Sequence, residues 1–138
     1  MNLSIVDASH YFRGMLLLIK TDRQITGQEF DIMKRLGKAL GFEEQFCETA
    51  INEILDNPYI DTAHPVFSSK DVAQQFIKDG LTLAIADKEV HTGEVEWLQA
   101  TAQKNDIDLQ WFKQEARSLR GSDNLDIKLF FNNLVTMI

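Results

Sequence analysis

Apolar residues along the chain recur at three- and four-residue spacings, the pattern of amphipathic helices. Between residues 27 and 40, for example, Phe30, Met33, Leu36 and Leu40 fall on one helical face. Alternating β-branched runs bounded by Asn-Gly or Asp-Gly turns, which would indicate strands, do not occur in the sequence. The pattern therefore predicts an all-α fold.

The helix limits follow from local signals. Asp7 is placed to cap the first helix, and a serine of the Ser68-Ser69 pair is placed to cap the fourth. Gly41 ends the second helix as a C′ glycine would, and Pro58 stops the third. We therefore expect seven helices, over about residues 8–20, 27–40, 43–55, 70–86, 93–104, 109–119 and 123–138.

The second half of the sequence repeats the first at an offset of 65 residues. Thr21-Asp22-Arg23-Gln24-Ile25 matches Ala86-Asp87-Lys88-Glu89-Val90, and Glu29 with its neighbours matches Glu94 with its neighbours. Such self-similarity predicts an internal duplication. We expect one domain, residues 1–138, in which two three-helix units pack with pseudo-twofold symmetry: repeat one at about 8–56, repeat two at about 69–120, and a closing helix at about 123–138.

The repeat also bears on the aromatic residues. Phe46 and Trp111 occupy equivalent positions, as do Ile32 and Trp97, so all four are expected to be core residues. In the third helix we expect Phe46 to face inward together with Ala50, Ile51 and Ile54.

Composition is that of a globular chain, with 44% apolar and 25% charged residues. The only cysteine, Cys47, lies among acidic residues that would raise its thiol pKa, so we interpret it as a packing residue. A single cysteine permits no intramolecular disulfide, which suits a reducing cytoplasmic location. No run approaches the roughly 20 apolar residues of a membrane-spanning helix, so we expect no membrane insertion.

The net charge of −7 narrows the partners. Nucleic acids and anionic lipids need clustered positive charge, so we expect neither as the main partner. Cations and basic protein surfaces remain compatible with an acidic chain.

Four carboxylates stand at equivalent places in the two repeats: Asp22, Glu29, Asp87 and Glu94. Each Asp follows the last turn of one helix, and each Glu opens the next. If the halves pack about a pseudo-twofold axis, both acidic turns can fall at one end of the molecule. Clustered carboxylates favour a hard divalent cation, Ca²⁺ or Mg²⁺, and no Cys/His set has zinc-ligand spacing.

A structural interpretation stands beside this one. Thr26-Gly27-Gln28-Glu29 is a capping box, in which Glu29 needs only to bond the backbone of the cap residue. In the second copy His91 stands at the cap position and Glu94 persists, which favours a functional role slightly. The turns are not EF-hands, because the first and third loop positions of the first copy would be Leu18 and Lys20.

The duplicated pattern, Thr-Asp or Ala-Asp followed by Ile25 or Val90 and then by Glu29 or Glu94, resembles the TerB-like family, the helical domain first named for tellurite resistance proteins. The resemblance covers about residues 8–119. It implies two pseudo-symmetric three-helix halves and a divalent cation held at one end, by Asp22, Glu29, Asp87 and Glu94. The family often has glycine after the Asp, where this chain has Arg23 and Lys88.

Three hypotheses of function follow. The first is a non-enzymatic TerB-like module that binds a divalent cation at the paired acidic turns and docks an unidentified protein partner in a stress or tellurite and metal-resistance response. The second is a protein-interaction scaffold whose acidic turns only cap helices. The third is a hydrolase that uses the same carboxylates on water.

Overall fold

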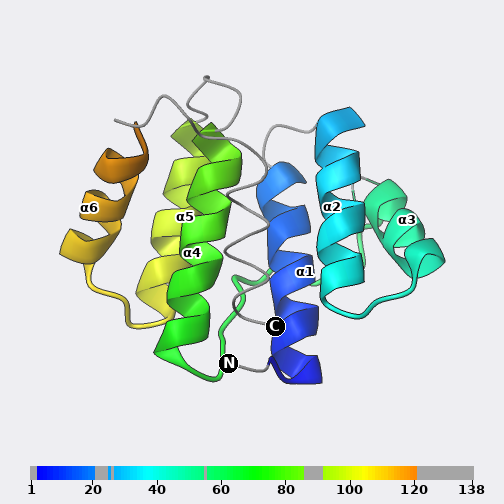
Figure 1. Cartoon of the computed structure of the whole chain (residues 1–138), viewed down its shortest axis with the longest axis horizontal. Coiled ribbons are helices and arrows are strands. Elements are labelled where there is room, and N and C mark those ends of the chain that lie inside the picture. The colour runs from blue at the N-terminus through cyan, green and yellow to red at the C-terminus, as the bar shows by residue number, and fades with distance from the viewer. Residues whose placement is uncertain (1–2, 21–24, 26, 55, 86–91, 121–138) are drawn as a thin grey trace.

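The computed structural model describes residues 3–20, 25, 27–54, 56–85 and 92–120 of the chain (Figure 1). All regular secondary structure in them is helical, which confirms the all-α prediction. The expected closing helix, 123–138, lies outside the described residues. None of the described helices is both long and apolar enough to cross a membrane. The six helices are α1 (Ile5–Lys20), α2 (Gly27–Ala39), α3 (Glu44–Glu53), α4 (Lys70–Ile85), α5 (Thr92–Lys104) and α6 (Leu109–Arg120).

The helices form two groups of three in chain order. Helices α1, α2 and α3 lie on one side of the molecule and α4, α5 and α6 on the other, with α1 in contact with α2, α4 and α5 (Figure 1). Each of α4, α5 and α6 begins 65 residues after its counterpart α1, α2 or α3. The spacing read from the motifs thus recurs in the helix starts.

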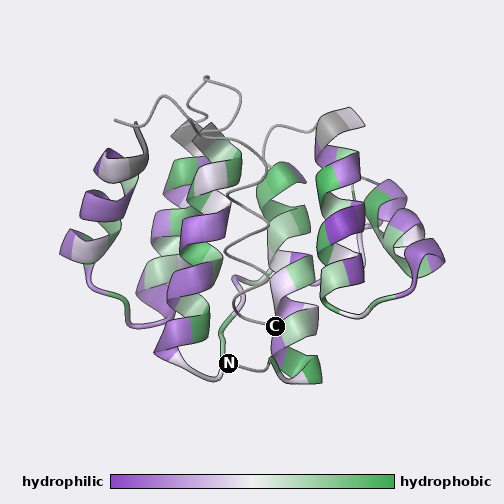
Figure 2. Ribbon diagram, in the orientation of Figure 1, coloured by the Kyte–Doolittle hydropathy of each residue, from purple (hydrophilic) through white to green (hydrophobic). Residues whose placement is uncertain are grey.

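Helix α1 is the centre of the core. Its five consecutive residues from Met15 to Ile19 are all buried, and Figure 2 shows its upper part as predominantly hydrophobic on the side seen. A helix that is apolar all round must be covered all round. Here the neighbouring helices supply that cover, and the largest buried side chains of α2 to α5 pack against it or each other.

The start of α1 corrects one prediction. Ser4 is the residue that caps the helix, because its hydroxyl accepts a hydrogen bond of 3.0 Å from the backbone N–H of Asp7. Asp7 is instead a buried residue inside the first turn, and its carboxylate accepts hydrogen bonds from the backbone N–H and the hydroxyl of Ser68. The predicted cap role of Asp7 is wrong because an earlier serine takes it. The expected serine cap of α4 is confirmed at Ser69, whose hydroxyl accepts from Val72 N–H at 3.3 Å.

The contact between α1 and α4 is reciprocal. The Tyr11 hydroxyl of α1 donates a hydrogen bond to the Asp79 carboxylate of α4, and the Phe76 ring of α4 lies against Gly14 of α1. The Tyr11 and Phe76 rings meet edge to face, with centroids 5.2 Å apart. A Cβ atom at Gly14 would come within 2.7 Å of the Phe76 ring and 2.8 Å of Pro65, so the close approach of the helices requires glycine there.

Helices α2 and α5 end in the same way. Gly41 has a φ of +92°, its N–H bonds the Lys38 carbonyl, and the Phe42 N–H bonds the Gly37 carbonyl. This pairing is a Schellman motif, and it confirms Gly41 as the C′ glycine. Sixty-five residues later, Asp106 has a φ of +57°, and Asp106 and Ile107 repeat the two hydrogen bonds to Gln103 and Ala102.

The loop between α3 and α4 is tied to both halves. Arg13 of α1 donates to the carbonyls of Asp61 and Ala63, at 3.0 and 2.6 Å. Asn105 at the end of α5 donates to the Pro65 carbonyl and accepts from the Phe67 N–H, each at 2.9 Å. These side chains give the loop backbone the partners that a helix or sheet would otherwise supply.

The predicted core positions are confirmed with one clear exception. Met33, Leu36, Ile51 and Ile54 are buried. Half-buried positions packed on the core are Phe30, Leu40, Ala50, Trp97 and Trp111. Phe46 is 54% exposed, so its predicted inward position is wrong. Its ring projects from α3 beside α1 instead of entering the space between α2 and α3, which Cys47 and Ile51 occupy.

The glycine at the α1–α4 contact gives a first prediction. Gly14→Ala should lower the free energy of unfolding by about 1–3 kcal/mol, because the added methyl meets a packed ring and a proline. Urea denaturation followed by circular dichroism would measure it. Gly27→Ala is the control, since nothing lies within 4 Å of a Cβ there. An equal loss in both variants would contradict the steric explanation.

The two Schellman motifs give a second prediction. Asp106→Gly should raise the free energy of unfolding by about 0.5 kcal/mol, because glycine relieves the left-handed strain and loses only part of that gain to chain entropy. Gly41→Ala should lower it by about 1 kcal/mol for the opposite reason. Thermal unfolding of the two variants beside the wild type measures both, and shifts of the same sign would refute the equivalence of the two turns.

Candidate functional site

The described part of the predicted cation site consists of Glu29 and Glu94. Each is the third residue of its helix, α2 and α5 respectively. Glu29 is half-buried and Glu94 is buried, with 4% of its surface exposed. Helices α2 and α5 both begin at the upper end of the molecule in Figure 1, so the two first turns belong to the same end.

The other two predicted ligands, Asp22 and Asp87, lie outside the described residues, as does His91. Among the residues that are described, no three His, Cys, Asp or Glu side chains converge as a metal site would require. The four-carboxylate site therefore stays a prediction. The start of α5 adds one detail: Thr92 is its first helical residue, so the cap position falls on His91.

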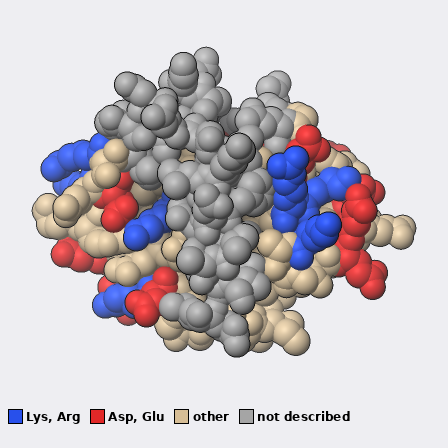
Figure 3. All heavy atoms as spheres, viewed as in Figure 1, with Lys and Arg blue, Asp and Glu red and all other residues tan. Residues whose placement is uncertain are grey.

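Charged side chains join α2 to α3. Lys34 of α2 lies 2.9 Å from both Glu44 and Glu48 of α3, and its ammonium lowers the pKa of the Glu44 carboxyl by hydrogen bonding. Hydrogen bonds to the two glutamates raise the pKa of Lys34. Figure 3 shows basic side chains over α2 and acidic ones over α3 on the face seen. These exposed pairs contribute little to stability, and they leave Lys34 engaged.

Cys47 lies on the buried side of the same helix pair. Burial, followed by the nearby Glu44, raises the pKa of its thiol. The sulfur is also where a Cβ atom of Gly37 would fall, so it fills the closest approach of α2 and α3. The interpretation of Cys47 as a packing residue agrees with each of these observations.

Asp79 is the most unusual polar group of the core. It is fully buried, and its carboxylate accepts hydrogen bonds from the Tyr11 hydroxyl and, at 3.0 Å, from the Gln75 amide. Both of these hydrogen-bond donors are neutral. Burial outweighs the hydrogen bonds and raises the pKa of Asp79 to about 7, while burial and the nearby Asp79 raise that of Tyr11 well above its usual value. The carboxyl therefore gains a proton far above the pH at which an exposed Asp does.

Sequence reasoning missed Asp79, although a signal was present. Val72, Phe76 and Leu83 precede and follow it at spacings of seven, three and four residues, so Asp79 falls on the apolar face of α4. A charged residue on such a face must have buried partners. The partner, Tyr11, is 68 residues away, so the sequence could not name it.

His64 holds the loop against α5. Its ring stacks on Trp97 with centroids 5.0 Å apart, and its Nδ1 lies 2.7 Å from the Thr101 hydroxyl. That hydroxyl donates to the Trp97 carbonyl, so His64 Nδ1 donates to the hydroxyl oxygen. Burial, followed by Lys104, lowers the pKa of His64. The arrangement keeps the imidazole neutral and gives it a packing role.

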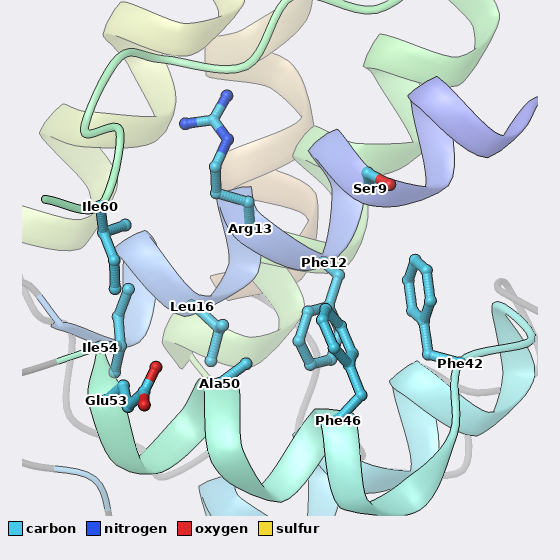
Figure 4. Close-up of a pocket in the computed structure, with 10 residues that line it drawn as sticks. All are labelled: Ser9, Phe12, Arg13, Leu16, Phe42, Phe46, Ala50, Glu53, Ile54 and Ile60. Carbon is cyan, nitrogen blue, oxygen red and sulfur yellow. The ribbon is translucent and has the colours of Figure 1, made fainter. Parts of the chain in front are cut away.

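The largely apolar recess on the molecule is a groove between α1 and α3, about 230 Å³ in volume. We call it the α1–α3 groove. Figure 4 shows α1 and α3 as its two walls, with Ile60 at one end and Phe42 at the other, and with the Arg13 guanidinium directed away from it. Its apolar lining consists of Phe12, Leu16, Phe42, Phe46, Ala50, Ile54 and Ile60.

The groove exists because the two halves pack differently. In the second half α4 and α6 are in close contact, whereas the described helices α1 and α3 have no comparable contact. Both groove walls are regular: Phe12 and Leu16 are four residues apart on α1, as are Phe46, Ala50 and Ile54 on α3. Two apolar helix faces thus stand apart where their counterparts meet.

The buried carboxyl gives a third prediction. A carboxyl whose pKa is higher in the folded than in the unfolded chain stabilises the fold below the unfolded value and loses that contribution as pH rises to about 7. Asp79→Asn should therefore gain stability relative to the wild type between about pH 4 and pH 7, by a few kcal/mol in all. Urea denaturation across this range measures the difference. Asp71→Asn, an exposed position of the same helix, is the control, and a wild-type-like pH profile in Asp79→Asn would reject the assignment.

The chain matches no protein-family model, no curated protein and no solved structure. The functional proposal therefore rests on the residues and contacts described above.

Proposed function

We propose that the chain is a non-enzymatic TerB-like module that binds Ca²⁺ or Mg²⁺ at its paired acidic turns and docks a protein partner in a stress or metal-resistance response. The observation that carries the proposal is the recurrence of Glu29 as Glu94, each the third residue of a helix, at one end of the molecule. Asp22 and Asp87 complete the proposed ligand set. Hard divalent cations take oxygen ligands of this kind.

An internal duplication is part of the proposal, and three observations support it. The helix starts recur at an offset of 65 residues, and so do the Schellman motifs at Gly41 and Asp106. The α1–α4 contact is also reciprocal. Tyr11 and Phe76 are equivalent by this offset, as are Gly14 and Asp79, so each aromatic ring contacts the equivalent position of the other helix. Isologous contacts of this kind are what a two-fold axis produces.

A second function, a protein-interaction scaffold without a metal, is favoured by two other observations. The third helical position is where the Glu of a capping box belongs, so Glu29 and Glu94 would serve their helices without a cation. The α1–α3 groove offers an apolar surface that lies apart from the acidic turns. The two functions differ in a single property, the response of the turns to metal.

Calcium and magnesium titration of the full chain, followed by NMR, tests the proposal. We expect saturable shifts at Asp22, Glu29, Asp87 and Glu94 at millimolar metal or below, within the range of oxygen-ligand sites. The double variant Glu29→Gln with Glu94→Gln should lower the affinity at least about tenfold, because each loses a charged ligand.

Glu43→Gln with Glu53→Gln is the matched control, since both of these glutamates are exposed and lie on or beside α3. It should leave the metal affinity unchanged. Shifts confined to surface carboxylates, or a double variant with wild-type affinity, would leave the scaffold function in place of the cation-binding one.

A further inference from the structure

We propose that the α1–α3 groove is the docking site of the module and that it takes a basic amphipathic helix of another protein. The inference rests on the partner-docking half of the proposed function and is independent of its cation site. It is carried by the shape of the groove, by its exposed aromatic ring and by the distribution of charge around it.

The shape of the groove fits a helix. Its walls are two helix faces, with Phe12 and Leu16 on α1 and Phe46, Ala50 and Ile54 on α3 (Figure 4). In the second half the equivalent helices, α4 and α6, close against one another. An amphipathic helix with large apolar residues at spacings of three, four and seven residues would pack between such walls.

The aromatic residues supply the anchor of this surface. Phe46 is 54% exposed, yet its ring lies 5.4 Å from that of Phe42 and 6.2 Å from that of Phe12, measured between centroids. Phe12 itself is buried and 5.6 Å from Phe42. A supported but exposed aromatic ring buries a large apolar area at small entropic cost when a partner covers it, as interface hot spots do.

Charge selects the partner. Residues 39–69, which include α3 and the loop after it, contain no Lys or Arg. Their formal charge is therefore −6, nearly the whole of the chain's −7, and it comes from Glu43, Glu44, Glu48, Glu53, Asp56 and Asp61.

Two basic residues from elsewhere act on this segment. Lys34 pairs with Glu44 and Glu48 on the α2 side of α3, away from the groove. Arg13 lines the groove, but it donates to loop carbonyls and its guanidinium is directed away (Figure 4). Glu53 lines the groove and is exposed, with Asp56 just beyond the end of α3. Lys and Arg flanking the apolar anchors of a partner helix would meet this acidic end, where the dipole of α3 is also negative.

Three synthetic peptides of about 14 residues, roughly four helical turns, test the proposal with the full chain. The first carries Leu and Trp on one face and Lys elsewhere, the second has the same apolar face with Glu for Lys, and the third is the first with its order scrambled. Fluorescence anisotropy in EDTA, which removes any contribution of divalent cations, measures the affinities. We expect the first peptide to bind at least about tenfold more tightly than the other two.

Variants locate the binding. Phe46→Ser should weaken the first peptide at least about tenfold, whereas Val66→Ser, at 55% exposure outside the groove, should leave its affinity unchanged. Glu53→Gln should weaken it up to about fivefold and reduce the effect of added salt. Thermal melting confirms that each variant is folded.

Four results would overturn the inference: equal binding of the scrambled peptide, equal binding of the acidic peptide, undiminished binding by Phe46→Ser, and no binding of the first peptide at millimolar chain. A dimer of the chain in sedimentation that Phe46→Ser converts to monomer would also overturn it, by making a second copy the occupant. None of these results depends on whether the acidic turns bind metal, so failure here and failure of the cation site are distinguishable.

Discussion

The rest of the structure depends on the close approach of α1 to α4, where the two halves meet. Gly14 permits it, because any side chain there would collide with Phe76 and Pro65. The approach brings the Tyr11 hydroxyl to Asp79 and removes both from water, so the junction combines ring packing with a buried hydrogen bond. Burying a carboxyl opposes folding unless its oxygens are satisfied. Tyr11 and Gln75 satisfy them, which ties the position of α1 on α4 to a specific pair of side chains.

From this junction the differences between the halves can be understood. Because α1 also contacts α5, one helix of the first half is covered on several sides, and its buried run from Met15 to Ile19 requires that cover. In the second half α6 closes on α4, whereas α3 stands away from α1 and leaves a groove beside Phe46. The repeat in sequence therefore sets the secondary structure of both halves alike, while the packing around α1 makes the two outer helices unequal.

Periodicity and end signals were enough to predict the helices of the described residues to within about three residues, since these signals are local. Gly41 and Ser69 act as predicted, but Asp7 does not, because Ser4 lies one turn earlier and the partner of Asp7, Ser68, is distant in sequence. Phe46 was misplaced for a related reason. An apolar residue at helical spacing indicates a face, and only the tertiary arrangement decides whether a neighbouring helix covers that face.

The candidate sites divide along the same line. Glu29 and Glu94 could be selected from sequence because the repeat duplicates them, and their helices begin at one end of the molecule as two-fold packing requires. The groove could not be predicted, because it is a departure from the repeat: Trp111 and Phe46 are equivalent in sequence, yet α6 packs on α4 and α3 does not pack on α1 in the same way. Symmetry thus points to the proposed cation site and its violation to the proposed docking surface. A duplicated domain gains a second kind of site where one copy stops packing like the other, since a face left uncovered by its own chain is open to a partner.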